Sequence, residues 1–305
     1  MKTKGYLVVA FGADRYINLA IALGRSLLLH EPDTPRAVVT DCARTELSQI
    51  FTHVIPYDAS FGSDVLQKMH IDLYSPFDET LFIDSDCLVV RPLIHVWKRF
   101  EGRYFGAMGS RYLRSGDRDN FLNVERTLRN FRVDSLPKFN GGVYYFSRSD
   151  ESNRFFEYAR SLIPRHDEFC DASFRGVPAD EALYSVAMAA HGIELVDFCE
   201  AGMYTPIGSK GKIEVDVFAK RSYFVKEGRA VRPDIVHFAG TWADTFTYAR
   251  ECRRLTLGTE LTRSRTIRQN AKIYADSFIA TVLKKCRKWL TIPRRVLRKA
   301  VLNSA

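Results

Sequence analysis

The sequence lacks the features that mark membrane-spanning and disulfide-stabilised proteins. Its six cysteines lie far apart, and none forms a CxxC or CxxH pair, which argues against a zinc ribbon or a disulfide scaffold. No run approaches the roughly 18 uninterrupted apolar residues of a membrane span. The apolar run from Tyr6 to Phe11 is too short for the core of a signal peptide. These absences predict a protein of the reducing cytosol.

Excess charge is also absent from most of the chain. The formal net charge is +9, but twelve of the 45 basic residues and only one of the 36 acidic residues lie from Arg263 onward. The preceding residues hold 33 basic and 35 acidic side chains and are nearly neutral. This asymmetry predicts a folded domain over 1–262 and a basic tail over 263–305 whose partner is anionic.

What the sequence does contain is a regular alternation of apolar runs and helical patterns. Strand-like runs cover 6–11, 37–40, 53–57 and 80–83, and helical patterns cover 17–29, 43–51 and 64–74. Because strands that alternate with helices form βαβ units, the pattern predicts an α/β fold with a mainly parallel sheet flanked by helices. Ligands of such sheets bind at the carboxyl ends of the strands.

The alternation becomes less regular after residue 100. Further strands are expected over 104–108, 139–147 and 234–240, and a helix over 180–192. The segment 110–136 is polar and is expected to be an irregular insertion that shapes a substrate site.

Two aspartates at the end of a predicted strand are the most informative feature. The apolar segment 80–83 runs directly into Asp84 and Asp86, and apolar residues resume at Leu88. Two carboxylates this close repel each other and are costly to desolvate. A divalent cation would remove the repulsion. A turn with two solvated aspartates is the alternative, although the apolar flanks favour the metal site.

The Asp-x-Asp motif also fits a second chemistry. Phosphatases of the haloacid-dehalogenase type carry a strand that ends in Asp-x-Asp-x-Thr or Asp-x-Asp-x-Val, with one aspartate as nucleophile. This chain has Leu88 at the place of the Thr or Val, and no later strand ends in an acid pair. The phosphatase is kept as an alternative.

Four segments, in order, resemble one family. They are YLVVAFGADRYINLAIALGRSLL, YSPFDETLFIDSDCLVVRPL, FNGGVYYFS and HFAG, and they span roughly residues 5 to 245. They resemble nucleotide-sugar glycosyltransferases of the GT-A fold, most of all glycosyltransferase family 8, the family of glycogenin and of bacterial lipopolysaccharide glycosyltransferases. The resemblance implies a GT-A fold and a UDP-linked sugar donor.

The resemblance also implies roles for individual residues. Asp84, Asp86 and His237 would hold Mn²⁺ or Mg²⁺, a donor set that suits these ions. The residues that would contact the nucleotide-sugar are Phe11, Gly12, Ala13, Asp14, Tyr16, Lys68, Ser85, Asn140, Gly141, Gly142 and Gly240. Without the resemblance, His237 reads as a core histidine and Lys68 as a solvated lysine.

Asp180 and Glu181 occupy the start of the helix whose acid or amide lies near the anomeric carbon in the family. The spacing to the next leucine is one residue shorter here, so which of the two is catalytic stays open. Favourable charge at a helix N-terminus explains one of them. The family's lysine after HFAG is missing, which leaves the phosphate contact unassigned, with Lys210 and Lys212 as candidates.

The tail has the pattern of an interfacial helix. Up to Pro293, apolar residues such as Trp289 and Leu290 lie on one side and basic residues on the other. The alternatives are a helix packed on the body and a nucleic-acid tail. Packing alone does not need so many basic residues, and nucleic-acid tails usually lack such a regular apolar face. We therefore expect residues 264–305 to contact an anionic membrane surface, and no nucleic acid is expected.

These observations predict a metal-dependent glycosyltransferase that works with retention. Its acceptor would be a glycan or lipid-linked sugar, and the protein would be peripheral at the cytosolic face of a membrane. The alternatives are the phosphatase and a catalytically inactive, membrane-bound, glycosyltransferase-like scaffold. The missing lysine favours the scaffold, whereas the set of Asp84, Asp86 and His237 favours the enzyme.

Overall fold

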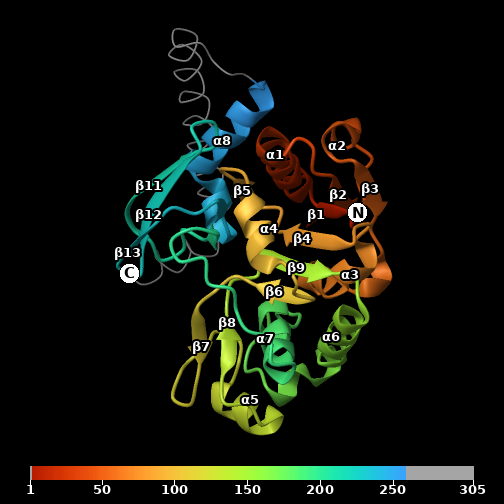
Figure 1. Cartoon of the computed structure of the whole chain (residues 1–305), viewed down its shortest axis with the longest axis vertical. Helices are drawn as coiled ribbons and strands as arrows, with labels where there is room; N and C mark the ends of the chain where they lie inside the picture. The colour runs from red at the N-terminus through yellow and green to blue at the C-terminus, as the bar shows by residue number, and fades with distance from the viewer. Residues whose placement is uncertain (1, 259–305) are drawn as a thin grey trace, which may run out of the picture. The chain divides into compact units, whose positions relative to one another are not determined.

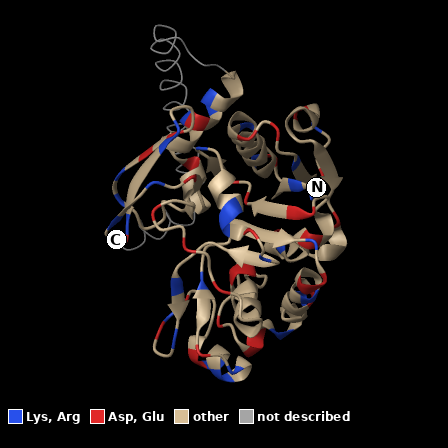
Figure 2. Cartoon of the chain, in the orientation of Figure 1, with Lys and Arg blue, Asp and Glu red and all other residues tan. Residues whose placement is uncertain are grey.

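The computed structural model describes residues 2–258 (Figure 1). The chain divides after Ala239 into two compact units. The described part of the second unit holds a 3₁₀ helix, η4 (Gly240–Asp244), and helix α8 (Phe246–Leu257). The basic tail expected over 263–305 lies outside the described residues. Acidic and basic residues are interspersed along the described elements (Figure 2).

The first unit is built on a six-stranded sheet. In spatial order its strands are β3 (His53–Pro56), β2 (Arg36–Thr40), β1 (Lys4–Val9), β4 (Glu79–Ile83), β9 (Val143–Ser147) and β6 (Phe105–Ala107). The first four run parallel, whereas β9 is antiparallel to both β4 and β6. The expected α/β fold with a mainly parallel sheet is confirmed.

Both faces of this sheet are buried, which explains the nearly continuous apolar runs of its strands. Successive residues of a strand point to opposite faces, so Leu81 and Ile83 join one core and Phe82 joins the other. The helices of the first core are α1 (Asp14–His30), α2 (Thr45–Ile50) and α4 (Ile94–Phe100). Those of the second include α6 (Asp150–Ser161) and α7 (Asp180–Ala190).

The connection from β3 to β4 differs from the helix expected over 64–74. It consists of η1 (Ala59–Phe61), η2 (Asp64–His70) and one α-helical turn, α3 (Ile71–Tyr74). The buried Gln67 side chain donates hydrogen bonds to the carbonyl oxygens of Asp58 and Gly62, at 2.8 and 2.6 Å. These bonds tie the tighter 3₁₀ turn to the preceding loop, so a tertiary contact overrides the helical pattern.

Shorter strands complete the first unit. β5 (Cys87–Val89) pairs with β14 (Ile235–His237), which pairs with β10 (Met203–Tyr204). β11 (Lys210–Asp216), β12 (Arg221–Lys226) and β13 (Arg229–Val231) form an antiparallel sheet, and β7 (Arg111–Leu113) pairs with β8 (Leu136–Lys138). A 3₁₀ helix, η3 (Ile163–Glu168), follows α6.

Two expectations about the second half of the first unit are wrong in part. The segment 110–136 is not irregular throughout, because it contains β7 and helix α5 (Val124–Phe131), whose N-terminus is capped by the Asn123 side chain. The strand expected from residue 139 begins at Val143, since the preceding residues form a turn. Within residues 2–258, no helix combines the length and hydropathy that crossing a membrane requires.

Candidate active site

The candidate site lies where the carboxyl ends of β1 and β4 meet. The two strands are parallel neighbours, with Leu7 opposite Phe82. The loop after β1 and the aspartates after β4 therefore share one edge of the sheet. The chain then enters β5, which pairs with β14 so that Cys87 lies opposite His237. This pairing brings His237 to the aspartates although it lies far from them in sequence.

Two acidic residues at the start of α7 belong to the same neighbourhood. Asp180 is buried and accepts a hydrogen bond of 2.8 Å from the Tyr144 hydroxyl. Burial, together with the Asp180 charge, raises the pKa of Tyr144, so the hydroxyl keeps the proton that it donates. The Glu181 carboxylate accepts a hydrogen bond of 2.9 Å from the backbone N–H of Gly141. Burial and the Asp180 charge raise the pKa of Glu181.

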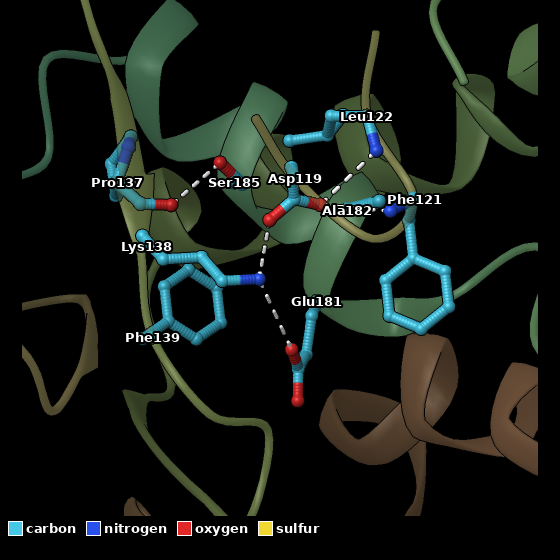
Figure 3. Close-up of a pocket in the computed structure, with 9 residues that line it drawn as sticks. All are labelled: Asp119, Phe121, Leu122, Pro137, Lys138, Phe139, Glu181, Ala182 and Ser185. Carbon is cyan, nitrogen blue, oxygen red and sulfur yellow. Dashed lines mark hydrogen bonds and ion pairs between the residues drawn. The ribbon is translucent and has the colours of Figure 1, made fainter. Parts of the chain in front are cut away.

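Glu181 also borders a small pocket, shown in Figure 3. The pocket is lined by Asp119, Phe121, Leu122, Pro137, Lys138, Phe139, Glu181, Ala182 and Ser185. The Lys138 ammonium lies 2.5 Å from an Asp119 carboxylate oxygen and 4.0 Å from a Glu181 oxygen. The pocket has room for about one water molecule, so a larger ligand would need its walls to move.

The positive charge of Lys68 offsets the repulsion between the carboxylates. Its Nζ lies 2.6 Å from Asp84 Oδ2 and 3.5 Å from Asp180 Oδ2. Burial alone would lower the pKa of Lys68, but the Asp180 and Asp84 charges outweigh burial and raise it, so the ammonium stays charged. Burial raises the pKa of Asp84 even with Lys68 beside it. One ammonium thus links the first aspartate of the pair to α7.

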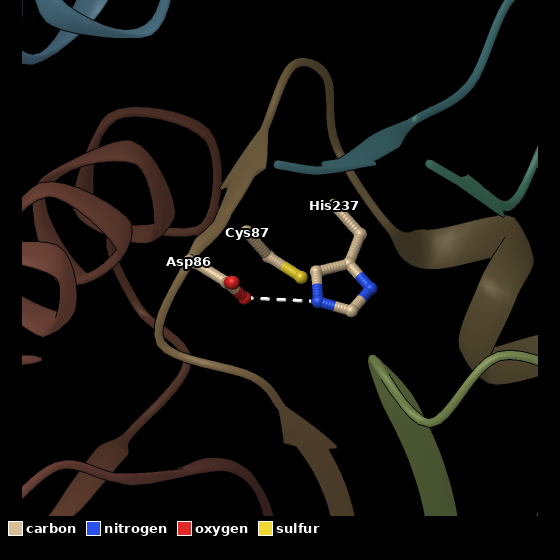
Figure 4. A group of neighbouring side chains, drawn as sticks. All are labelled: Asp86, Cys87 and His237. Atoms are coloured by element: carbon tan, nitrogen blue, oxygen red, sulfur yellow. Dashed lines mark ion pairs between the residues drawn. The ribbon is translucent and has the colours of Figure 1, made fainter. Parts of the chain in front are cut away.

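The second aspartate is balanced by His237 (Figure 4). His237 Nε2 lies 2.9 Å from Asp86 Oδ1 and 3.7 Å from Asp84 Oδ2. Burial opposes charge on both partners, but their attraction lowers the pKa of Asp86 and raises that of His237. Cys87 lies in the same group. Because burial raises the pKa of its thiol, Cys87 is neutral and a weak ligand.

The turn before β9 fixes the orientation of His237. The Asn140 side-chain oxygen bonds His237 Nδ1, which leaves Nε2 to face the aspartates. A Cβ atom on Gly142 would lie 2.5 Å from the same imidazole, so only glycine fits there. The Gly142 carbonyl accepts a hydrogen bond of 2.9 Å from the Asp84 backbone N–H. Asn140, expected to bind donor hydroxyls, therefore has a partner within the protein.

The donor atoms fit a divalent cation. Two carboxylates and one imidazole suit Mn²⁺, and carboxylates also suit Mg²⁺. Ligand atoms around one ion at about 2.1 Å lie on the order of 3 to 4 Å apart. His237 Nε2 lies at such distances from both carboxylates. Among the described residues, the group whose ligand atoms all lie within 4.8 Å of one another is Asp86, Cys87 and His237, whereas the Asp84 carboxylate is paired with Lys68. A hydrogen bond on the other ring nitrogen, as Asn140 makes, is the usual support of a histidine ligand.

The loop after β1 is held by contacts with neighbouring segments. The Gly12 N–H donates to the Asp41 carboxylate at 3.0 Å, and its φ of +79° is one that glycine adopts readily. Phe11 stacks on Tyr57 with ring centroids 4.3 Å apart. Asp14 forms an ion pair of 2.9 Å with Arg44. Ala13 is the residue before α1.

The remaining expected residues lie as follows. Tyr16 is in the first turn of α1, and its hydroxyl accepts a hydrogen bond from Arg175. Ser85 lies buried between the two aspartates. Gly240 begins the second unit with φ of +64°. Lys212 pairs with Glu214 on β11. Within residues 2–258, neither it nor Lys210 is seen to contact the aspartates.

Sequence reasoning missed three residues of this site. Tyr144 lies within the quoted FNGGVYYFS segment, and strand alternation places it on the α7 face of the sheet. That alternation is the signal that could have paired it with Asp180. Lys138 and Asp119 come from segments whose residues are neighbours only after folding, and nothing local in the sequence marks them.

Comparison with known proteins decides the fold. No family model matches the sequence, and no curated protein matches it. Among solved structures, the galactosyltransferase LgtC in complex with donor and acceptor sugar analogs matches with a TM-score of 0.55 and 13% identity, over 86% of this chain and 98% of LgtC. An active-site mutant of LgtC matches with a TM-score of 0.53 and 14% identity, over 85% and 98%. The chain has the GT-A glycosyltransferase fold.

At this identity the likeness shows the fold alone. The expected GT-A fold is thereby confirmed, whereas the resemblance to glycosyltransferase family 8 in particular stays a prediction. In this GT-A chain, the loop after β1, the two aspartates and His237 all lie at the edge where ligands of parallel sheets bind.

Proposed function

We propose that this chain is a metal-dependent glycosyltransferase that moves a sugar from a UDP-linked donor to a glycan or lipid-linked acceptor, with retention of anomeric configuration. The observation that carries the proposal is the meeting of Asp84, Asp86 and His237 at the carboxyl edge of a GT-A sheet. Carboxylate and imidazole ligands have chemistry suited to Mn²⁺, and carboxylates also suit Mg²⁺.

Asp84, Asp86 and His237 would hold a divalent ion, which would supply positive charge for the diphosphate leaving group. The protein's own groups bind and orient the donor around it. The loop from Phe11 to Tyr16 receives the nucleotide, and the glycines at 141 and 142 let the donor sugar approach the backbone closely. Asp84 and Asp180 stabilise the charged form of Lys68, and the Lys68 ammonium in turn keeps Asp84 in place.

Of the two acids on α7, Glu181 is the one we assign to the reacting centre. Its side chain is 25% exposed, whereas that of Asp180 is 8% exposed, so Glu181 is the acid that a ligand can reach. Asp180 instead is buried between the Tyr144 hydroxyl and the Lys68 ammonium, where it positions both. Lys138 lies 4.0 Å from Glu181 and favours its charged form.

The basic tail supports a lipid-linked acceptor. Residues 264–305 would hold the protein at the cytosolic face of an anionic membrane, where such acceptors are presented. The concentration of basic residues beyond Arg263 is the supporting observation.

The alternatives differ in what they require. The phosphatase loses its structural basis because the fold is that of GT-A proteins. A catalytically inactive scaffold keeps the fold but would cleave no donor, so turnover separates it from the enzyme.

Thermal-shift measurements with nucleotides test the proposal. UDP should raise the melting temperature of the wild-type protein only when Mn²⁺ or Mg²⁺ is present, and Asp86→Asn should abolish this effect. Asp171→Asn is the control, because Asp171 pairs with Arg126 away from the carboxyl edge. Equal stabilisation in chelator would contradict the metal dependence. No stabilisation under any condition would favour the scaffold.

A further inference from the structure

A tight turn after η3 presents an arginine toward the loop that follows β1. Phe174 and Val177 exchange two backbone hydrogen bonds, of 2.7 and 3.0 Å. Arg175 and Gly176 between them have φ of +52° and +87°. Positive φ at both central positions is the mark of a type I′ turn, which favours Asn or Gly. Strained backbone positions cluster at functional sites, so a long side chain held at one points to a functional role.

The contacts of Arg175 join segments distant in sequence. Its Nη1 donates to the Tyr16 hydroxyl at 3.0 Å and lies 3.4 Å from an Asp64 carboxylate oxygen. Its guanidinium carbon lies 4.9 Å from the centre of the Phe174 ring. The side chain is still 53% exposed. Since a guanidinium has five N–H donors, most of its hydrogen-bonding capacity is left for a ligand.

Both partners of Arg175 belong to segments that are connected to the aspartates. Tyr16 follows the loop after β1, and β1 is the neighbour of β4, which ends at Asp84. Asp64 begins η2, and Lys68, four residues on, binds Asp84. Four residues of 3₁₀ helix advance by about 8 Å. Arg175 therefore contacts both the first turn after the proposed nucleotide loop and the segment that carries Lys68.

The charges around this position call for a cation. Asp64 is the acidic partner of Arg175. On the same 3₁₀ segment, the Lys68 ammonium is held between Asp84 and Asp180. A nucleoside diphosphate entering here brings further negative charge. The lysine that the resemblance would place after HFAG is missing. Arg175 has the charge and the exposed donors to bind phosphate oxygens.

We propose that Arg175 binds the diphosphate of the nucleotide-sugar. This inference rests on the proposed function and names a residue of its donor site. On binding, the guanidinium exchanges its contacts with Tyr16 and Asp64 for phosphate oxygens, which it meets in bidentate geometry. The tight turn already holds the guanidinium in place, so binding costs little conformational entropy.

Isothermal titration of the full chain with uridine, UMP and UDP, in the presence of Mn²⁺, tests the assignment. Arg175→Met keeps the length of the side chain and removes its charge. It should weaken UDP binding by about ten-fold or more and leave uridine binding within two-fold, with UMP between them. Arg175→Lys should recover part of the loss, because a lysine keeps the charge but not the fork.

Arg132→Met is the matched control, since Arg132 is an exposed arginine that also has positive φ, +53°, and ends α5 away from the aspartates. It should leave all three affinities unchanged. Equal loss of uridine and UDP affinity in Arg175→Met would overturn the phosphate assignment, as would no loss of either. If the wild-type protein binds none of the three, the proposed function itself fails, whatever Arg175 does.

Discussion

At Asp84 and Asp86, the side chains of Lys68 and His237 lie against the two carboxylates. The sequence marks the aspartates by their place at the end of an apolar strand, but it gives no local sign of their partners. Lys68 is expected to face the donor only through resemblance, and in the structure it bridges Asp84 and Asp180. His237 likewise would read as a core residue without the resemblance. Individual residues of the site were therefore predictable where they follow a strand.

Glu181 is the residue whose loss should separate chemistry from binding. Glu181→Gln keeps the shape and the hydrogen bond from Gly141, but removes the charge needed in the transition state. We expect turnover to fall by about 100-fold or more, with UDP affinity nearly unchanged. Steady-state kinetics and UDP titration measure the two quantities. Near-normal turnover would mean that Glu181 only places charge at the N-terminus of α7.

Asp180→Asn is the companion variant. Because Asp180 holds Lys68 and Tyr144, its replacement should disturb UDP binding and thermal stability together. A variant that loses turnover alone would exchange the roles assigned to the two acids.

At the scale of elements, strands were predicted better than the connections between them. The apolar runs report strands buried on both faces, and β1, β2, β3 and β4 lie where the runs do. The sequence predicts strand for the turn before β9 because Phe139 is apolar. In the structure, Asn140 and the two glycines that follow it are fixed in a turn by contacts with His237 and α7. Helix α5 was missed since its apolar residues are sparse and its packing is tertiary.

Gly142 shows how this turn serves the site. A Cβ at this position would come within 2.5 Å of His237 Nδ1, and the imidazole is buried. Gly142→Ala should therefore displace His237, lower Mn²⁺ affinity by ten-fold or more, and cost about 1 to 3 kcal/mol of stability. Titration with Mn²⁺ and chemical denaturation measure the two effects.

Gly24→Ala is the control for Gly142→Ala. Its Cβ would meet Ile50 at 2.5 Å in the packing of α1 against α2, so the steric conflict is equal but lies in the core. It should lower stability and leave Mn²⁺ affinity unchanged. If both variants bind Mn²⁺ normally, His237 is not a ligand.

At the scale of the whole molecule, the alternation of strands and helices was sufficient to predict the α/β class, because a parallel sheet needs helices on both faces. The pairing of β5 with β14, which completes the site, joins segments too distant for local patterns to report. The tail is a compositional prediction, and it lies outside the described residues.

The tail prediction concerns where the protein works. Each basic side chain near an anionic surface contributes about 1 kcal/mol, so the residues beyond Arg263 can hold the chain on a membrane. Full-length protein should sediment with anionic liposomes, weakly with neutral ones, and be released in part by salt. A chain that ends at Gly258 should stay in the supernatant and still bind UDP. Sedimentation of the shortened chain would place the membrane contact elsewhere, and its unfolding would show that the tail packs on the body.

The release of UDP from nucleotide-sugars tests the central claim most directly. With Mn²⁺, the wild-type protein should release UDP from at least one donor among UDP-glucose, UDP-galactose and their N-acetylated forms. Release should cease in chelator and in Asp86→Asn, and persist in Asp171→Asn. The account is contradicted if UDP is released equally in chelator, or if no donor is cleaved while simple phosphoesters are.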